Sequence, residues 1–447
     1  MLTRYIYILI LTLPSFCFSQ NPVASFDLPY IDFTSEVQKK YAPQVPVVDP
    51  LQMNQFTTMN QRQRNAQIMA EVDAHVATEQ ARKDRVNKLI DDAVNAMPKI
   101  QYERRGPNIE GRERFYEAFS QIAEMLTDSS KLDLTKAVYL TEAAYNPDLS
   151  WKSYQDGIQK MLTHISYKLE SDNIKADDQV ARNMALFSFF TDTLTYDYPN
   201  EGPVTSYPLL YDFDDFWGRE DAANLFVSKL MNKGTGQCHS LPLLYLILAE
   251  QTGTDAHMAL APNHSYIKFQ DEFGNWHNME LTNHSLTSDQ FVQASGYITA
   301  ESIQNKMYMH PLTKKEVIAQ CLSDLAIYYS KKFGQERFVY DAARFSYEHN
   351  QKSITPHQLI NNYYYYNLNY VIHQYKQYGL TKEQFERDEK AQHIKNQLIG
   401  SQKFIERVGY QDMPPEQYER WLNSVKEEQN KQNHKIKMRT LMGQIDN

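Results

Sequence analysis

The 447-residue chain has 46 lysine and arginine residues against 55 aspartate and glutamate residues, a formal net charge of −9. This acidic balance argues against a nucleic-acid partner or an anionic membrane surface held through bulk charge. Hydrophobic residues make up 42% and charged residues 23% of the chain, which is ordinary for a globular protein with room for two or three domains.

Residues 1–19 have the pattern of a secretory signal peptide. A basic residue precedes an apolar run, Tyr5–Leu13, that is too short to span a bilayer. Cys17 and Ser19 are small residues at the −3 and −1 positions of a cleavage site, so we expect a secreted or periplasmic protein cut after Ser19. The alternative, a lipoprotein with Cys17 lipidated, fits poorly because the large Phe16 precedes that cysteine. We expect no membrane span elsewhere in the chain.

Residues 20–110 are predicted to form an extended arm followed by a long helix. The first part is rich in proline and has no regular period, which is typical of a linker. From 56 to 97 the sequence is polar, and the apolar residues Ile68, Val72 and Val76 recur every four positions. We expect a helix that packs on the rest of the protein. A coiled coil with another chain is the alternative, although no heptad holds for long.

Residues 111–200 are predicted to form a helical domain. Amphipathic stretches alternate with turn signals, and Ser150 is a suitable helix cap. The aromatic-rich residues 195–218 are interpreted as a loop that covers the core or lines a cleft. The acidic residues in that loop lack the glycine and the closing glutamate of an EF-hand calcium site. The predicted helices span 112–127, Leu134–Tyr145, 151–169 and 177–194.

Residues 201–300 contain the candidate site, which begins at Cys238. A helix from 221 to 230 is predicted to precede it, and an apolar helix is predicted from about Cys238 to Gln251. Unpaired N–H groups at a helix start favour a thiolate and can hold an oxyanion. A structural disulfide between Cys238 and Cys321 is the alternative, but a thiol that opens a helix after a glycine-rich run is the favoured interpretation.

Three strands are predicted after this helix, with a turn centred near residue 272. In that register Lys268 faces Trp276 and His264 faces Glu280, so the carboxylate would fix the imidazole tautomer. The other ring nitrogen would then face Cys238. The predicted strands span Ala256–Ala261, His264–Gln270 and Trp276–Leu281.

Four further histidines near this site make zinc the rival interpretation. The sequence contains no H-E-x-x-H and no paired C-x-x-C spacing, so we expect no metal and no cofactor. Gln237 and Asn263 are candidate oxyanion donors. The four histidines are His239, His257, His277 and His284.

Residues 301–380 and 381–447 are predicted to be helical again. Small and aromatic residues in the first segment are spaced roughly as in a tetratricopeptide unit. These C-terminal helices are a possible surface for a protein partner. Residues 424–447 are polar and are expected to fray. The predicted helices span 313–332, 336–349, 356–378, 381–407 and 415–430.

Gly236-Gln237-Cys238 at a helix start, His264 on the following strand, and Trp276 before Glu280 together resemble the transglutaminase-like superfamily. Glu280 departs from the aspartate that is usual in that pattern. The helical region before the core and the tetratricopeptide-like helices after it are similar to the bacterial SirB-type branch, as are the stretches 132–137 and 145–149.

The resemblance implies an α+β, predominantly helical fold, with a papain-like core and a small antiparallel sheet flanked by helical regions. It implies a cysteine hydrolase or acyl transferase in which Cys238 is the nucleophile, His264 the general base and acid, and Glu280 the orienting carboxylate. The substrate would be an amide bond in a protein or peptide. The alternative is a non-catalytic binding or scaffold protein with a relic core and helical partner-binding flanks.

Overall fold

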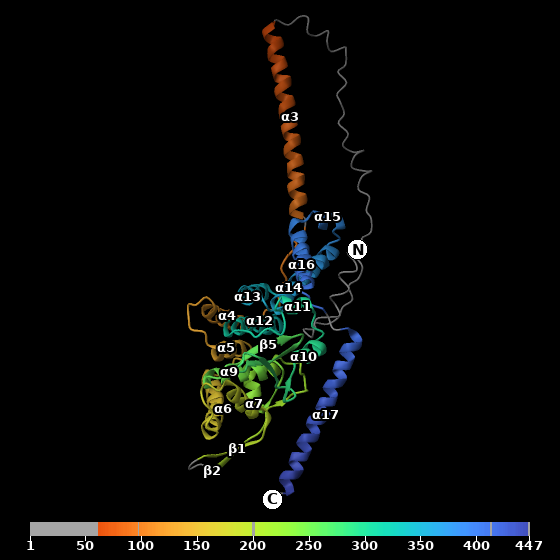
Figure 1. Ribbon diagram of the computed structural model, residues 1–447. Coiled ribbons are helices and arrows are strands. Elements are labelled where there is room, and N and C mark those ends of the chain that lie inside the picture. The colour runs from red at the N-terminus through yellow and green to blue at the C-terminus, as the bar shows by residue number, and fades with distance from the viewer. Residues whose placement is uncertain (1–60, 97, 199–201, 412–413, 446–447) are drawn as a thin grey trace. The chain divides into compact units, whose positions relative to one another are not determined.

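The computed structural model describes residues 61–96, 98–198, 202–411 and 414–445 (Figure 1). These residues fall into two compact units. The first unit holds those from Tyr102 to Tyr370 and from Glu389 onward, and the second unit holds the others. The predicted signal peptide, Cys17 and the proline-rich arm lie outside the described residues.

The chain is predominantly helical with small sheets, as the sequence predicts. Helix α14 (Thr355–Gln377) contributes residues to both units. The other helices of the first unit are α4 (Arg112–Leu126), α5 (Leu134–Tyr145), α6 (Trp151–Ser171), α7 (Gln179–Thr191), the 3-10 helix η2 (Ala222–Leu225), α8 (Val227–Lys233), α9 (Ser240–Thr252), α10 (Asp289–Gly296), α11 (Ala300–Gln304), α12 (Lys314–Phe333), α13 (Arg337–His349), α16 (Glu389–Arg407) and α17 (Pro415–Ile445).

The largest sheet is an antiparallel meander in the order β5-β6-β7-β8. Two smaller pairs accompany it, an antiparallel hairpin of β1 and β2 and a parallel pair of β3 and β4. Helix α9 packs against β5 and β6 of this sheet and against α6 and α7. The strands are β1 (Leu194–Tyr198), β2 (Gly202–Ser206), β3 (Leu210–Tyr211), β4 (Thr235–Gly236), β5 (His257–Ala261), β6 (His264–Gln270), β7 (Trp276–Glu280) and β8 (Ser285–Thr287).

The register between β6 and β7 differs from the predicted one. Gln270 pairs with Trp276 and Lys268 pairs with Asn278, so the prediction that Lys268 faces Trp276 is wrong by two residues. Because side chains alternate between faces along a strand, a slip of two residues leaves every side chain on its predicted face. The error therefore changes which residues are directly opposed, and it does not change which residues share a face.

The turn after β6 explains this register. The Asp271 carboxylate accepts hydrogen bonds from the N–H groups of Phe273, at 3.0 Å, and Asn275, at 2.8 Å. The Asp271 N–H donates to the Asn275 carbonyl at 3.0 Å, which extends the strand pairing by one more step. Gly274 has a φ of +81°, a conformation that glycine adopts without steric cost. The turn is thus centred on residue 273 and not near 272.

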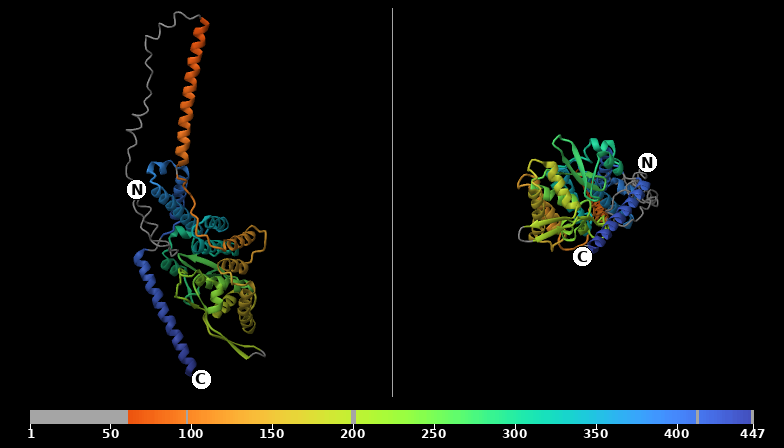
Figure 2. Two further views of the ribbon diagram at one scale, coloured as in Figure 1. Left: turned by 180° about the vertical axis from the view of Figure 1, so that it is seen from behind. Right: turned by 60° about the horizontal axis from the view of Figure 1, so that its bottom comes forward.

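The aromatic-rich residues 195–218 are not a plain loop, which corrects the prediction. Strands β1 and β2 form a hairpin that projects from the first unit (Figure 2). Tyr196 is buried, and its ring stacks on His164 of α6 with centroids 4.9 Å apart. Aromatic and β-branched residues favour strands when one face can pack against a helix, and this tertiary contact is not visible in the sequence.

The helix predicted from 221 to 230 is interrupted at Phe226. That residue has an extended conformation, with φ −83° and ψ 144°, between η2 and α8. The Glu142 carboxylate of α5 accepts hydrogen bonds from the N–H groups of Val227, at 2.7 Å, and Ser228, at 3.0 Å. A distant acidic side chain therefore caps α8, so the helix begins there although the local sequence gives no break signal.

One hydrophobic core joins the helices before the sheet to those after it. Phe115 of α4 is fully buried and meets the rings of Tyr329 and Phe333 of α12 edge-on, with centroids 5.4 and 5.7 Å apart. Ala342 and Ala343 of α13 are buried in the same core, where small side chains allow close packing of helices. The regions predicted as 111–200 and 301–380 thus bury their apolar faces together.

The second unit contains α3 (Gln61–Ala96) and α15 (Lys382–Arg387). Within it the Gln374 side chain hydrogen-bonds both main-chain groups of Gln101. The Tyr375 hydroxyl donates to Asp388 at 2.6 Å. Helix α3 runs for 36 residues, in agreement with the predicted long helix.

Helix α17 continues to Ile445, where fraying was predicted from residue 424. Its glutamine, glutamate and lysine residues are good helix formers, which accounts for the longer helix. Across the described ranges no helix is both long enough and apolar enough to cross a membrane.

Candidate active site

Cys238 lies in the turn between β4 and α9 and is half-buried. Helix α9 starts at Ser240, two residues later than predicted, although the Gln237 carbonyl already accepts the N–H of Leu241 at 3.0 Å. The Ser240 hydroxyl accepts the Gln237 N–H at 3.0 Å. A Cβ on Gly236 would stand 2.6 Å from that hydroxyl oxygen, so glycine is needed there. These contacts fix the backbone that presents the thiol.

His264 and Glu280 meet across the sheet. His264 Nε2 and Glu280 Oε2 are 2.7 Å apart, and the Glu280 side chain is only 8% exposed. In the observed register, paired residues on β6 and β7 lie equally far in sequence from residue 273. Tyr266 would therefore stand opposite Glu280, in place of His264. His264 therefore reaches the carboxylate diagonally, from the same face of the sheet. Their predicted direct opposition is wrong, while their contact is present.

The imidazole has a second partner in Cys238. Burial by itself lowers the pKa of His264, but the charge of Glu280, together with hydrogen bonds to Cys238 and Glu280, outweighs that effect. The pKa of His264 consequently lies well above its usual range. Because Glu280 occupies Nε2, Nδ1 is the nitrogen left for the thiol. The arrangement favours the protonated form of the imidazole.

Gln237 precedes Cys238 in the chain and is fully buried. Its Nε2 donates to the main-chain carbonyl of Asp212 at 3.1 Å, while its Oε1 has no hydrogen-bond partner among the described residues. The Asp212 carboxylate is held by Lys229 and by the Thr235 hydroxyl, the latter at 3.3 Å. The amide is thus held in place by a fixed segment after β3, with one N–H still available.

Asn263 presents its main chain to the thiol. It occupies the left-handed region, with φ +57°, in the two-residue turn between β5 and β6. Its carbonyl oxygen lies 3.7 Å from Cys238 Sγ, so a neutral thiol donates to it. The exposed side chain of Asn263 therefore does not make this contact.

Tyr211, Asp212 and Ser265 also belong to this site, and the sequence interpretation missed all three. The Ser265 hydroxyl donates to the Cys238 carbonyl. Burial, the Cys238 thiol and Asp212 together raise the pKa of Tyr211 well above its usual range. Alternation along β6 would have predicted that Ser265 faces away from His264 and toward α9. The parallel pairing of β3 with β4 had no comparable sequence signal.

The four neighbouring histidines have separate partners. His239 lies 3.5 Å from Asp324, His277 lies 3.0 Å from Asp271, and His284 hydrogen-bonds the Leu209 carbonyl at 2.8 Å. His257 hydrogen-bonds the Leu312 carbonyl at 3.0 Å. In the part of the chain that the structure describes, no group of three or more histidine, cysteine or acidic side chains is placed to hold a metal ion.

Cys238 and Cys321 are both free thiols in the structure. Cys321 is buried in α12, and burial, together with the nearby Asp324 and Glu142, raises its pKa well above the usual range. A buried thiol of this kind is inert, whereas Cys238 is only half-buried.

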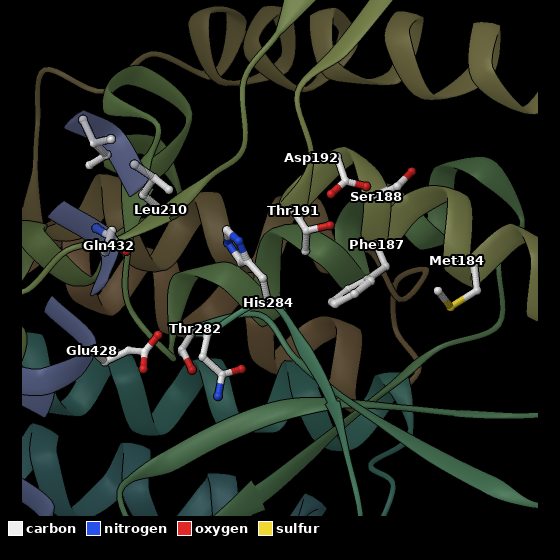
Figure 3. Close-up of a pocket in the computed structure, with 12 residues that line it drawn as sticks. Met184, Phe187, Ser188, Thr191, Asp192, Leu210, Thr282, His284, Glu428 and Gln432 are labelled. Atoms are coloured by element: carbon white, nitrogen blue, oxygen red, sulfur yellow. The ribbon is translucent and has the colours of Figure 1, made fainter. Parts of the chain in front are cut away.

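A cavity of about 450 Å³ lies elsewhere in the first unit (Figure 3). Residues of α7, the segment after β7 and α17 line it, including Phe187, His284 and Glu428. Cys238, His264 and Glu280 are not among its lining residues. This cavity is therefore separate from the cysteine and histidine pair.

No protein-family model and no curated protein matches the chain. The chain is similar to one solved structure, "Crystal structure of menin reveals the binding site for Mixed Lineage Leukemia (MLL) protein". The identity is 9% and the TM-score is 0.30, over 62% of this chain and 68% of the menin chain. A likeness at this level carries no argument about fold or function.

Proposed function

We propose that the chain is a secreted or periplasmic cysteine hydrolase or acyl transferase with a transglutaminase-like core. The observation that carries the proposal is a chain of contacts from Cys238 through the His264 ring to the buried Glu280. A nucleophile, a base within hydrogen-bond reach and a carboxylate that orients the base form the usual unit of thiol catalysis. The sequence resemblance points to the same three residues.

In the proposed reaction the Cys238 thiolate adds to the carbonyl carbon of an amide bond in a protein or peptide. The carbonyl π electrons move to oxygen and form a tetrahedral intermediate. When the intermediate collapses, the C–N bond breaks, and His264 gives its proton to the departing amine. A thioester on Cys238 remains. Water or a second amine then releases the acyl group, with His264 taking the proton of that nucleophile.

Glu280 is proposed to hold the imidazole and to stabilise its protonated form. Its carboxylate accepts from Nε2, which turns Nδ1 toward the thiol. Glutamate replaces the aspartate usual in the resembled pattern, and its longer side chain suits the diagonal approach between β7 and β6. Removing the carboxylate would leave a half-buried imidazole without its charge partner.

Gln237 is proposed as the oxyanion donor in preference to Asn263. Gln237 adjoins Cys238 in the chain, and its buried amide is anchored on the Asp212 carbonyl. Asn263 turns a carbonyl toward the thiol, and a carbonyl oxygen repels a developing negative charge. Asn263 serves better as the acceptor that holds the neutral thiol in the resting state.

That last contact favours a second candidate function, a non-catalytic binding or scaffold protein. A thiol that donates to the Asn263 carbonyl is not activated by His264 at that moment. In this alternative the core is a relic, and the helices after it bind a protein partner.

An acylation experiment distinguishes the two functions. The purified chain is mixed with a p-nitrophenyl ester, p-nitrophenol release is followed, and the acyl group is located by mass spectrometry. The catalytic proposal predicts a rapid burst with the acyl group on Cys238. The burst should be lost in Cys238→Ser and reduced about a hundredfold or more in His264→Ala. Cys321→Ser is the matched control and should keep the burst. An unmodified Cys238 would overturn the catalytic proposal.

A further inference from the structure

Helix α3 exposes apolar side chains on both sides of its middle. Its 36 residues give a length of about 54 Å. Six of its apolar side chains are between 48% and 65% exposed. Apolar exposure of this kind on a long helix marks a binding surface. The residues and their exposed fractions are Ile68 50%, Met69 59%, Val72 49%, Val76 60%, Val86 48% and Leu89 65%.

The apolar pattern follows a heptad once two charged residues are included in it. Met69, Val72, Val76 and Val86 occupy successive a and d positions, with Glu79 at d and Lys83 at a between them. The heptad therefore continues through the middle of the helix, where the apolar pattern alone is interrupted. Polar residues at a and d positions set the orientation and number of helices in a coiled coil.

The heptad has mirror symmetry about residue 81. In an antiparallel pair of helices, a positions meet d positions of the other helix, and residues at equal distances on either side of the centre lie level. With the centre at 81, Val76 meets Val86 of the partner subunit, and Glu79 meets Lys83 of the partner subunit. The second pair occurs twice, once on each side of the centre. Every central layer then contains two valines or two opposite charges.

We propose that α3 is a dimerisation helix that pairs with α3 of a second copy of this chain in an antiparallel coiled coil centred on residue 81. A parallel pair would place Glu79 against Glu79 of the partner subunit and Lys83 against Lys83 of the partner subunit, and like charges in a buried layer are disfavoured. Charge complementarity thus selects both the occupant and its direction.

The single helix does not satisfy these charges well. An ion pair along α3 joins Glu79 to Arg82 at 3.7 Å, with the Arg82 side chain 67% and the Glu79 side chain 43% exposed. A pair of this kind contributes little to stability. The same Glu79 carboxylate would be partly desolvated between two helices, where an opposite charge has a larger effect. The proposal does not depend on the catalytic assignment of Cys238.

The charge pattern provides the first test, by sedimentation velocity of the full chain. The proposal predicts a species of twice 52.3 kDa. Glu79→Lys should raise the dimer dissociation constant by about tenfold or more, because it creates two lysine pairs across the interface. Adding Lys83→Glu should restore dimerisation, since each lysine again meets a glutamate. Glu71→Lys is the matched control on the outer face of the helix and should have no effect.

Cysteine cross-linking gives the direction, in a background with Cys17, Cys238 and Cys321 replaced by serine. Val76→Cys mixed with Val86→Cys should form a disulfide-linked dimer, while either variant alone should not. In the antiparallel pair, the two copies of position 76 are about 15 Å apart along the axis. A monomer at every concentration overturns the proposal. So does cross-linking of each single variant with itself, which indicates parallel helices, and so does a double charge variant that stays dissociated.

Discussion

Glu142 should make the stability of the first unit depend on pH. Its carboxyl group is only 3% exposed and caps α8 through the N–H groups of Val227 and Ser228. Burial raises the pKa of Glu142 from 4.5 to about 7, although the hydrogen bonds from Ser228 and Val227 oppose this. Between pH 4.5 and about 7, the native state therefore keeps a proton on Glu142 that the unfolded chain has lost.

The sign and size of the effect follow from that difference. The contribution of the protonated Glu142 side chain to the free energy of unfolding is fully present below pH 4.5 and is lost as pH rises through about 7. The shift corresponds to about 3 kcal/mol of unfolding free energy. Glu142→Gln is neutral in both states and lacks this dependence. Its amide replaces one accepting oxygen, which should cost about 1 kcal/mol at every pH.

Urea denaturation of both proteins across this range is the assay. Because other titrating groups are shared, the difference in unfolding free energy between the two proteins isolates Glu142. The variant should be somewhat less stable than wild type below pH 4.5 and should gain about 3 kcal/mol relative to it above pH 7. A difference that stays constant with pH, or one that favours wild type as pH rises, would refute the reasoning.

Three further substitutions, one of them with a matched control, test the site and the core. Glu280→Gln should lower the pKa of His264, because burial is then opposed by less negative charge; NMR titration of the imidazole measures it, and an unchanged pKa contradicts the role given to Glu280. Gly236→Ala should cost about 1–3 kcal/mol, since its Cβ would stand 2.6 Å from the Ser240 oxygen. Gly400→Ala is its control: nothing lies within 4 Å, and it should stabilise α16 by up to about 1 kcal/mol. Phe115→Ala should cost about 3–5 kcal/mol in denaturant unfolding, and a loss below 1 kcal/mol would mean that α4 and α12 do not share a core.

Local sequence signals predicted much of the secondary structure. The bounds of α5 and β6 agree with the structure at both ends, and Ser150 caps α6 as expected. These elements have clear caps or alternation within a few residues. The break at Phe226 was missed because its cause, Glu142, is 84 residues away in the sequence. Capping by a distant side chain leaves no local signal.

Part of the site was also predictable from a local signal, the alternation of side chains along a strand. Faces alternate with a period of two, so His264 and Glu280 were expected on one face, and the two-residue register error did not separate them. The Asp271 hydrogen bonds that set the register were not anticipated. Contacts through the main chain, such as the Asn263 carbonyl at the thiol, have no residue-specific signal at all.

The most direct test of the proposed active site is the pH dependence of Cys238 alkylation by iodoacetamide, followed residue by residue by mass spectrometry. The proposal predicts that alkylation stays fast in mild acid, at about pH 6, where a free thiol with a pKa of about 8.5 reacts slowly. His264→Ala should abolish the acid reactivity, while Cys321→Ser and His257→Ala should preserve it. An unreactive Cys238, or a free-thiol profile that His264→Ala does not change, would contradict the catalytic pair.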